Sequence, residues 1–165
     1  MSRNVSMLSV QVRAMTLLAA AWLVAWPGMG RTDPAEEDAA AVKLDPEYAA
    51  GKQAIDAKDW PAAIKLLHSA ALRDTRNADI QNYLGYAYRH ADQLDLAFRH
   101  YQRALQLNPR HRGAHEYVGE AYLLVHNLAK AEEHLAALQK ICLIPCEEYA
   151  DLKQKVAEYR GKTSK

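Results

Sequence analysis

The chain has 165 residues, half of them hydrophobic and a quarter charged, and its formal net charge is +1. This length and composition fit one modest globular domain, and a near-neutral charge without a basic stripe gives no reason to expect a nucleic-acid partner. Ala, Leu, Gln, Lys and Glu are abundant and there is a single Phe, so we expect an all-α fold without strands.

Residues 1–30 have the layout of a secretory signal peptide. Basic residues but no acid accompany an apolar run from Ala14 to Trp26, and small residues stand just before Arg31. The run has about a dozen residues, fewer than the roughly 20 that a membrane-spanning helix needs. We therefore expect a periplasmic or secreted protein from which residues 1–30 are removed. The alternative is an uncleaved anchor, which would be the protein's only contact with a membrane.

Residues 31–43 are predicted to form a flexible acidic spacer. They contain four acids and Pro34 but no large apolar residue except Val42, so they cannot bury much surface. Asp45 followed by Pro46 then predicts the start of a helix, because Asp accepts from free backbone N–H groups and Pro is tolerated in the first turn.

Residues 44–145 repeat the same residue types every 34 positions, which divides them into units 44–77, 78–111 and 112–145. Each unit predicts a hairpin of two helices, because its small residues let the helices approach and its large ones fill the space around them. Three sets of residues stand at equivalent positions of the three units: Gly51, Gly85 and Gly119; Ala63, Ala97 and Ala131; and Leu67, Tyr101 and Leu135.

The central unit carries the fullest pattern, with Leu84, Gly85, Tyr88, Ala97, Tyr101, Ala104 and Pro109. This order resembles the tetratricopeptide repeat, whose pattern is Trp-x2-Leu-Gly-x2-Tyr, then Ala-x3-Phe, then Pro, although Gln81 replaces the opening Trp. The outer units match less well, as terminal repeats are expected to. The resemblance implies an α-solenoid of three stacked hairpins, in which the first helix of each hairpin lines a concave groove for a segment of a partner protein.

The groove residues that the resemblance implies lie on these first helices. They are Tyr48, Lys52, Asn82, Tyr86, Arg89, Glu116 and Glu120. The alternative is that these side chains form an ordinary solvated face. Some tetratricopeptide proteins hold the C-terminal carboxylate of a chaperone with Lys, Asn and Arg residues, but here Tyr83, Gly113 and Tyr117 stand in corresponding places, so we do not expect that clamp.

Residues 146–165 are predicted to form a capping helix and a tail. Tyr149, Leu152, Val156 and Tyr159 are spaced as one apolar stripe, with charged residues largely off it. Such a helix would cover the open end of the stack and turn its charged side to water.

Cys142 and Cys146 are the only cysteines, and they stand between the last repeat and the cap. Export and a spacing that brings the Cα atoms within reach predict a disulfide bond. The alternatives are two unbridged buried thiols and a redox-active or metal-binding pair.

We find no sequence motif for catalysis, and therefore expect neither enzyme activity nor a cofactor. His111 and His115 have a spacing that can bind a metal ion, but no third ligand stands near them, so we expect no metal site. The function that we expect is an exported adaptor that binds a segment of a partner protein. The alternatives are a structural subunit of an envelope complex or a homo-oligomer, and a thiol-redox accessory factor.

Overall fold

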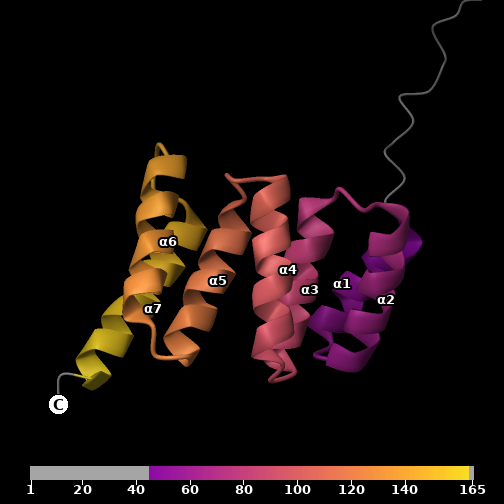
Figure 1. Ribbon diagram of the computed structural model, residues 1–165, viewed down its shortest axis with the longest axis horizontal. Coiled ribbons are helices and arrows are strands. Elements are labelled where there is room, and N and C mark those ends of the chain that lie inside the picture. The colour runs from indigo at the N-terminus through magenta and orange to yellow at the C-terminus, as the bar shows by residue number, and fades with distance from the viewer. Residues whose placement is uncertain (1–44, 164–165) are drawn as a thin grey trace, which may run out of the picture. The chain divides into compact units, whose positions relative to one another are not determined.

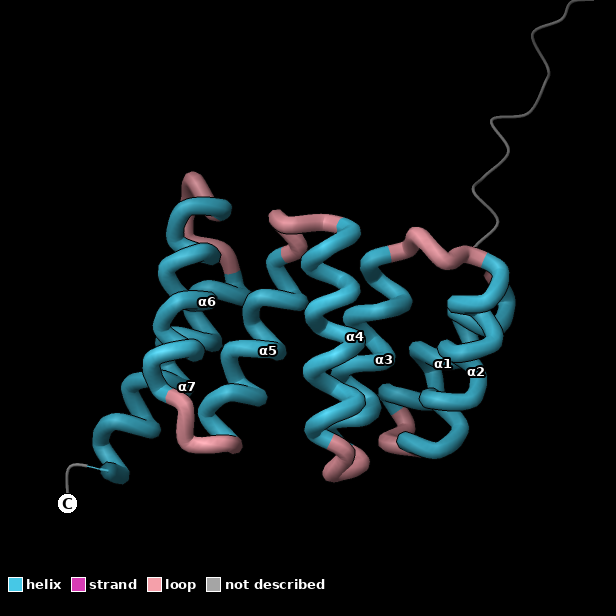
Figure 2. Tube along the Cα trace, viewed as in Figure 1, coloured by secondary structure: helices cyan, strands magenta, loops and turns pink. Residues whose placement is uncertain are grey.

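The computed structural model describes residues 45–163, so the expected signal peptide (1–30) and spacer (31–43) lie outside the described residues. The described residues form seven helices and no strand, which confirms the all-α expectation (Figures 1 and 2). The helices are α1 (Pro46–Asp56), α2 (Trp60–Arg73), α3 (Ala78–His90), α4 (Leu94–Leu107), α5 (Arg112–Leu124), α6 (Leu128–Ile141) and α7 (Glu147–Thr163). No helix in this part of the chain is both long and apolar enough to cross a membrane.

The helices follow the 34-residue period of the sequence. Successive second helices begin at Trp60, Leu94 and Leu128, each 34 residues after the one before. Figure 1 shows the helices stacked in chain order, from the pair α1 and α2 to the pair α6 and α7. Helix α7 begins at Glu147, 35 residues after Arg112 begins α5, and it packs against both α5 and α6. It therefore takes the place of the first helix of a fourth hairpin.

The turn within each hairpin has the same geometry. Lys58, Asp92 and His126 have φ values of 58°, 59° and 58°, in the left-handed region that a non-glycine residue seldom adopts. The residue after each of them donates its backbone N–H to a carbonyl five residues back, for example Asn127 to Tyr122 at 2.8 Å. This is the Schellman arrangement that ends a helix and satisfies its free carbonyl groups.

The second helices differ in how they begin. Asp59 Oδ1 accepts from the N–H of Ala62 at 3.1 Å, and Asn127 Oδ1 accepts from the N–H of Lys130 at 3.1 Å. Both side chains therefore cap their helices. Gln93 stands at the same place in the central hairpin and makes no capping bond with its side chain.

The repeated glycines mark the closest helix contacts. A Cβ atom on Gly85 would lie 2.5 Å from Cδ1 of Tyr101, across the central hairpin. Gly119 differs from Gly85 in the helix that it approaches. A Cβ atom on Gly119 would lie 2.6 Å from Leu152 of α7, rather than against Leu135 of its own hairpin. The closest approach in the last unit is thus made to the cap.

A second core holds the cap in place. Leu138 stands where the earlier units have alanine, and it is fully buried together with Ala131 and Leu152. The larger side chain packs in one core cluster with Leu152 and Val156 of α7.

The Sγ atoms of Cys142 and Cys146 lie 2.11 Å apart, at the distance of a disulfide bond. The pair joins the end of α6 to the start of α7. Between the cysteines, Leu143 and Ile144 are 97% and 81% exposed.

Candidate functional site

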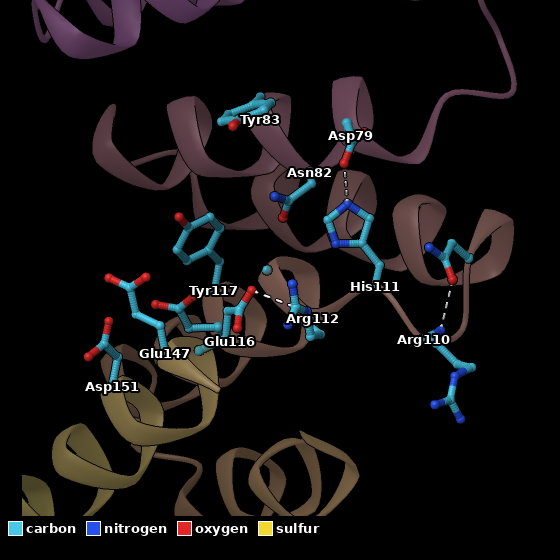
Figure 3. A pocket seen from close by; sticks show the side chains of 13 residues that line it. Asp79, Asn82, Tyr83, Arg110, His111, Arg112, Glu116, Tyr117, Glu147 and Asp151 are labelled. Carbon is cyan, nitrogen blue, oxygen red and sulfur yellow. Dashed lines mark hydrogen bonds and ion pairs between the residues drawn. The ribbon is translucent and has the colours of Figure 1, made fainter. Parts of the chain in front are cut away.

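Three adjoining hollows of about 500, 550 and 260 Å³ lie along one face of the stack, on side chains of α3, α5 and α7. Glu116, Tyr117 and Asp151 line both the first and the second, and Arg89 and Glu120 line both the second and the third. The hollows are therefore continuous, and we call them the α3–α5–α7 groove. Figure 3 shows the first of them.

Helix α3 presents three of the predicted groove residues to this groove. Asn82, Tyr86 and Arg89 are four and three residues apart, so they lie on one side of the helix. Leu84 and Tyr88 lie on the other side and are buried in the repeat core.

Arg89 lies deep in the groove and is held by the protein's own residues. Its side chain is only 10% exposed, and its Nη1 atom lies 2.9 Å from Oε2 of Glu120. The guanidinium also packs over the rings of Tyr86 and Tyr117, with its carbon 5.2 and 5.8 Å from their centroids. Because the ion pair between α3 and α5 is largely withdrawn from water, salt screens it less than it would a surface pair.

Asn82 has a buried amide with unused hydrogen-bonding capacity. The residue is 4% exposed, and its Oδ1 atom has no hydrogen-bond partner within residues 45–163. Figure 3 shows the amide directed into the hollow between Tyr117 and His111. Gly113 makes room for it, because a Cβ atom there would lie 3.2 Å from Nδ2 of Asn82. An unsatisfied buried oxygen costs about 1–3 kcal/mol, so a donor supplied from outside would be favoured here.

Glu116 is the second buried polar side chain of the groove. It is 8% exposed and makes no hydrogen bond or ion pair with any other described residue. Burial, reinforced by the nearby carboxylates of Glu120, Asp151 and Glu148 and opposed in part by Arg89, raises the pKa of Glu116 to about 8. The groove therefore holds a buried carboxyl group that forms no ion pair within the described residues.

Several other charges around the first hollow are already paired. Glu148 lies 3.4 Å from Nε of Arg112, and Asp79 lies 2.9 Å from Nε2 of His111. Arg110 also lines this hollow, but its guanidinium donates to the carbonyl of Ile141, 3.4 Å away.

The structure brings together most, but not all, of the residues predicted for the groove. Tyr48 is buried against Tyr83, with ring centroids 6.0 Å apart, and Nζ of Lys52 lies 5.4 Å from the Tyr83 ring. Neither residue lines the three hollows. The predicted residues that do line them are Asn82, Tyr86, Arg89, Glu116 and Glu120.

Sequence reasoning missed the contribution of α7. Glu147, Glu148 and Asp151 line the first hollow, although we expected the charged side of the cap to face only water. The start of α7, 35 residues after that of α5 and thus close to the 34-residue period, is the signal that could have placed them, because it makes α7 equivalent to another first helix.

His111 and His115 do not converge on a common site. His111 caps α5 by accepting from the N–H of Ala114 and also contacts Asp79, whereas Nδ1 of His115 lies 2.9 Å from Nδ1 of His134.

A comparison with known protein families identifies one of the 34-residue units. Residues 78–111 match the family model of the tetratricopeptide repeat. Human protein O-mannosyl-transferase TMTC3 is 28% identical over 94 residues, which cover 56% of this chain and 10% of that protein. The chain thus spans about a tenth of the length of this curated relative.

Solved structures share the fold. The Yersinia enterocolitica type III secretion chaperone SycD, in complex with a peptide of the translocator YopD, has a TM-score of 0.61 and 19% identity, over 70% of this chain and 88% of that one. The TPR2B domain of yeast Sti1, in a complex with pHsp70, has a TM-score of 0.65 and 19% identity, over 70% and 94%. At these identities the likeness is one of fold, and it supports a tetratricopeptide-type solenoid for the described residues.

Proposed function

We propose that this protein is an exported adaptor without catalytic activity, which binds an extended segment of a partner protein in the α3–α5–α7 groove. The observation that carries the proposal is the buried, unpartnered Oδ1 of Asn82 in a groove that three helices line. A backbone N–H of an extended segment is the donor that such an oxygen needs, and a groove open along its length accepts a chain more readily than a compact ligand.

Aromatic side chains supply the contact area for such a segment. Tyr83, Tyr86 and Tyr117 line the groove, and the rings of Tyr86 and Tyr117 lie 4.8 Å apart. Tyrosine is enriched among the residues that dominate binding energy, because it offers a large rigid surface with a polar end. The two similar structures were also solved in complex with partner proteins or peptides, which supports the same kind of function here.

The test is recovery of partners by the purified protein from an envelope extract, with quantification by mass spectrometry. A variant carrying Asn82→Ala and Tyr86→Ala should lose the partners while keeping its helical content and melting temperature. The matched control carries Lys65→Ala and Arg103→Ala, two exposed positions on the outer helices α2 and α4. Partners that stay with the groove variant but leave the control would place binding on the outer helices.

A structural subunit or homo-oligomer is the second candidate, and the loop between the two cysteines favours it. Leu143 and Ile144 are almost fully exposed there, which is unusual for two adjacent large apolar residues. If this loop joins copies of the chain, the sedimentation coefficient should rise with protein concentration, and the double substitution Leu143→Ser and Ile144→Ser should abolish that rise. A monomer at every concentration would dismiss self-association.

A further inference from the structure

The charged residues of the groove indicate which charge the bound segment carries. Beside the pairs that Glu120 and Glu148 form with arginine, the first two hollows contain Glu116, Glu147 and Asp151. None of these three makes an ion pair with another described residue. The groove thus presents an excess of negative charge around a side chain that is already buried.

We propose that the groove selects a partner segment with a lysine or arginine side chain, which pairs with Glu116 while a backbone N–H of the segment donates to Oδ1 of Asn82. This inference rests on the proposed function, and it adds the chemistry of the partner. Both residues line the first hollow and are more than nine-tenths buried. Within residues 45–163, Oδ1 of Asn82 has no hydrogen-bond partner and Glu116 forms no ion pair. One extended segment in that hollow can therefore satisfy both.

The cations already present do not fulfil this role. Arg89 is engaged by Glu120, Arg112 by Glu148, and the guanidinium of Arg110 donates to a backbone carbonyl. Lys155 lines the second hollow together with Glu116 but forms no ion pair with it. An acidic segment would be repelled by the unpaired carboxylates of Glu147 and Asp151, whereas the cation of a basic one would stabilise the ionised form of Glu116.

The raised pKa of Glu116 also supports a basic partner segment. A carboxyl group that burial and neighbouring carboxylates keep protonated is stabilised in its charged form when a cation arrives. Binding should therefore release a proton at neutral pH.

The experiment selects peptides without assuming a sequence. Phage-displayed random dodecapeptides are selected on the full chain as purified from cells, at low salt and at a pH above 8, where Glu116 is ionised. The affinity of synthetic copies is then measured for the parent, for Glu116→Gln and for Glu133→Gln. Glu133 is an exposed residue of α6 outside the three hollows, so it controls for the loss of one negative charge.

We expect the selected peptides to share a Lys or Arg at one position, and Glu116→Gln to weaken their binding about tenfold or more, while Glu133→Gln changes it little. Replacing the shared basic residue by norleucine should cause the same loss, and the two changes together should not add, because they remove one interaction. If Glu116→Gln does not fold, Asp151→Asn on the exposed side of α7 replaces it, with a smaller expected loss.

The experiment distinguishes failure of this inference from failure of the proposed function. The inference is overturned if the peptides share no basic position, or if they bind Glu116→Gln and the parent with equal affinity. If Tyr86→Ala still abolishes their binding in that case, the groove remains the binding site and the proposed function stands. If no peptide is enriched, or if Tyr86→Ala and Glu116→Gln both leave binding unchanged, the proposed function fails together with the inference.

Discussion

Gly85 is the residue at which the helices of the central hairpin come closest. A Cβ atom there would lie 2.5 and 2.6 Å from two ring atoms of the fully buried Tyr101. We expect Gly85→Ala to lower the free energy of unfolding by about 1–3 kcal/mol, because a buried ring has little room to move. Thermal melting followed by circular dichroism measures the change.

Gly161 offers the matched control for this substitution. It also lies in a helix, but nothing lies within 4 Å of the place a Cβ atom would take. Gly161→Ala should be neutral or stabilise by up to about 1 kcal/mol, as alanine does in an open helical position. Equal melting temperatures for the parent and Gly85→Ala would show that the central hairpin is packed less closely than the structure indicates.

His134 makes stability depend on pH. Its ring stacks on Tyr122 and meets His115, and burial together with the neighbouring His115 lowers the pKa of His134 from 6.5 to about 4. Below pH 6.5 the unfolded chain binds a proton that the folded protein does not, so this contribution to stability is present above pH 6.5 and is lost as the pH falls towards 4.

The substitution His134→Phe keeps a ring on Tyr122 and removes the titrating group. We expect the loss of stability between pH 6.5 and pH 4 to be smaller in the variant than in the parent, by about 1–3 kcal/mol. Urea unfolding at several pH values, with each protein referred to its own stability at pH 8, measures the difference. Parallel pH profiles would mean that His134 titrates alike in the folded and unfolded chains.

Among the elements, α4 begins without the side-chain cap that α2 and α6 have. Asn accepts well from the free N–H groups of a first turn and glutamine does not, so Gln93→Asn should stabilise the protein by about 0.5–2 kcal/mol. The reverse change, Asn127→Gln, should destabilise it by a similar amount. Chemical denaturation of the two variants beside the parent tests both, and a loss of stability in Gln93→Asn would contradict the comparison between hairpins.

How far the sequence predicts these elements depends on the range of the interactions involved. The hairpins follow from local spacing, and Asp59 and Asn127 were recognisable as caps. The apolar stripe of α7 was recognisable too, but a stripe does not say which neighbour it covers. Because α7 packs beside α5, the burial of Glu116 and the acidic character of the groove depend on contacts between units, and the periodicity of one helix cannot reveal them. The ion pair between Arg89 and Glu120 was missed for the same reason.

At the scale of the whole molecule, the bond between Cys142 and Cys146 fixes the cap to the stack. We expect protein purified without reductant to show no free thiol in denaturant. Replacing both cysteines by serine should lower the free energy of unfolding by about 2 kcal/mol, the chain-entropy estimate for so short a loop. Two titratable thiols per chain, or a double variant as stable as the parent, would mean that the pair does not hold the cap.

We also expect the mature protein to lack residues 1–30. Mass spectrometry of the protein recovered from the cell envelope should give an N-terminus at or near Arg31. A chain that starts at Met1 or Ser2 and is recovered from the cytosol would exclude export and the oxidising setting that the disulfide prediction assumes.

The position of α7 also bears on polymerisation. A stack of hairpins can in principle grow end to end, because each unit offers its neighbour the surface that it needs itself, and such head-to-tail contacts that do not close give filaments. Here the last helix stands where another hairpin would start, yet Lys153, Lys155 and Glu158 on it are all exposed. A further copy would have to strip water from these charges without gaining an apolar surface. These charges therefore oppose end-to-end growth of the stack at α7.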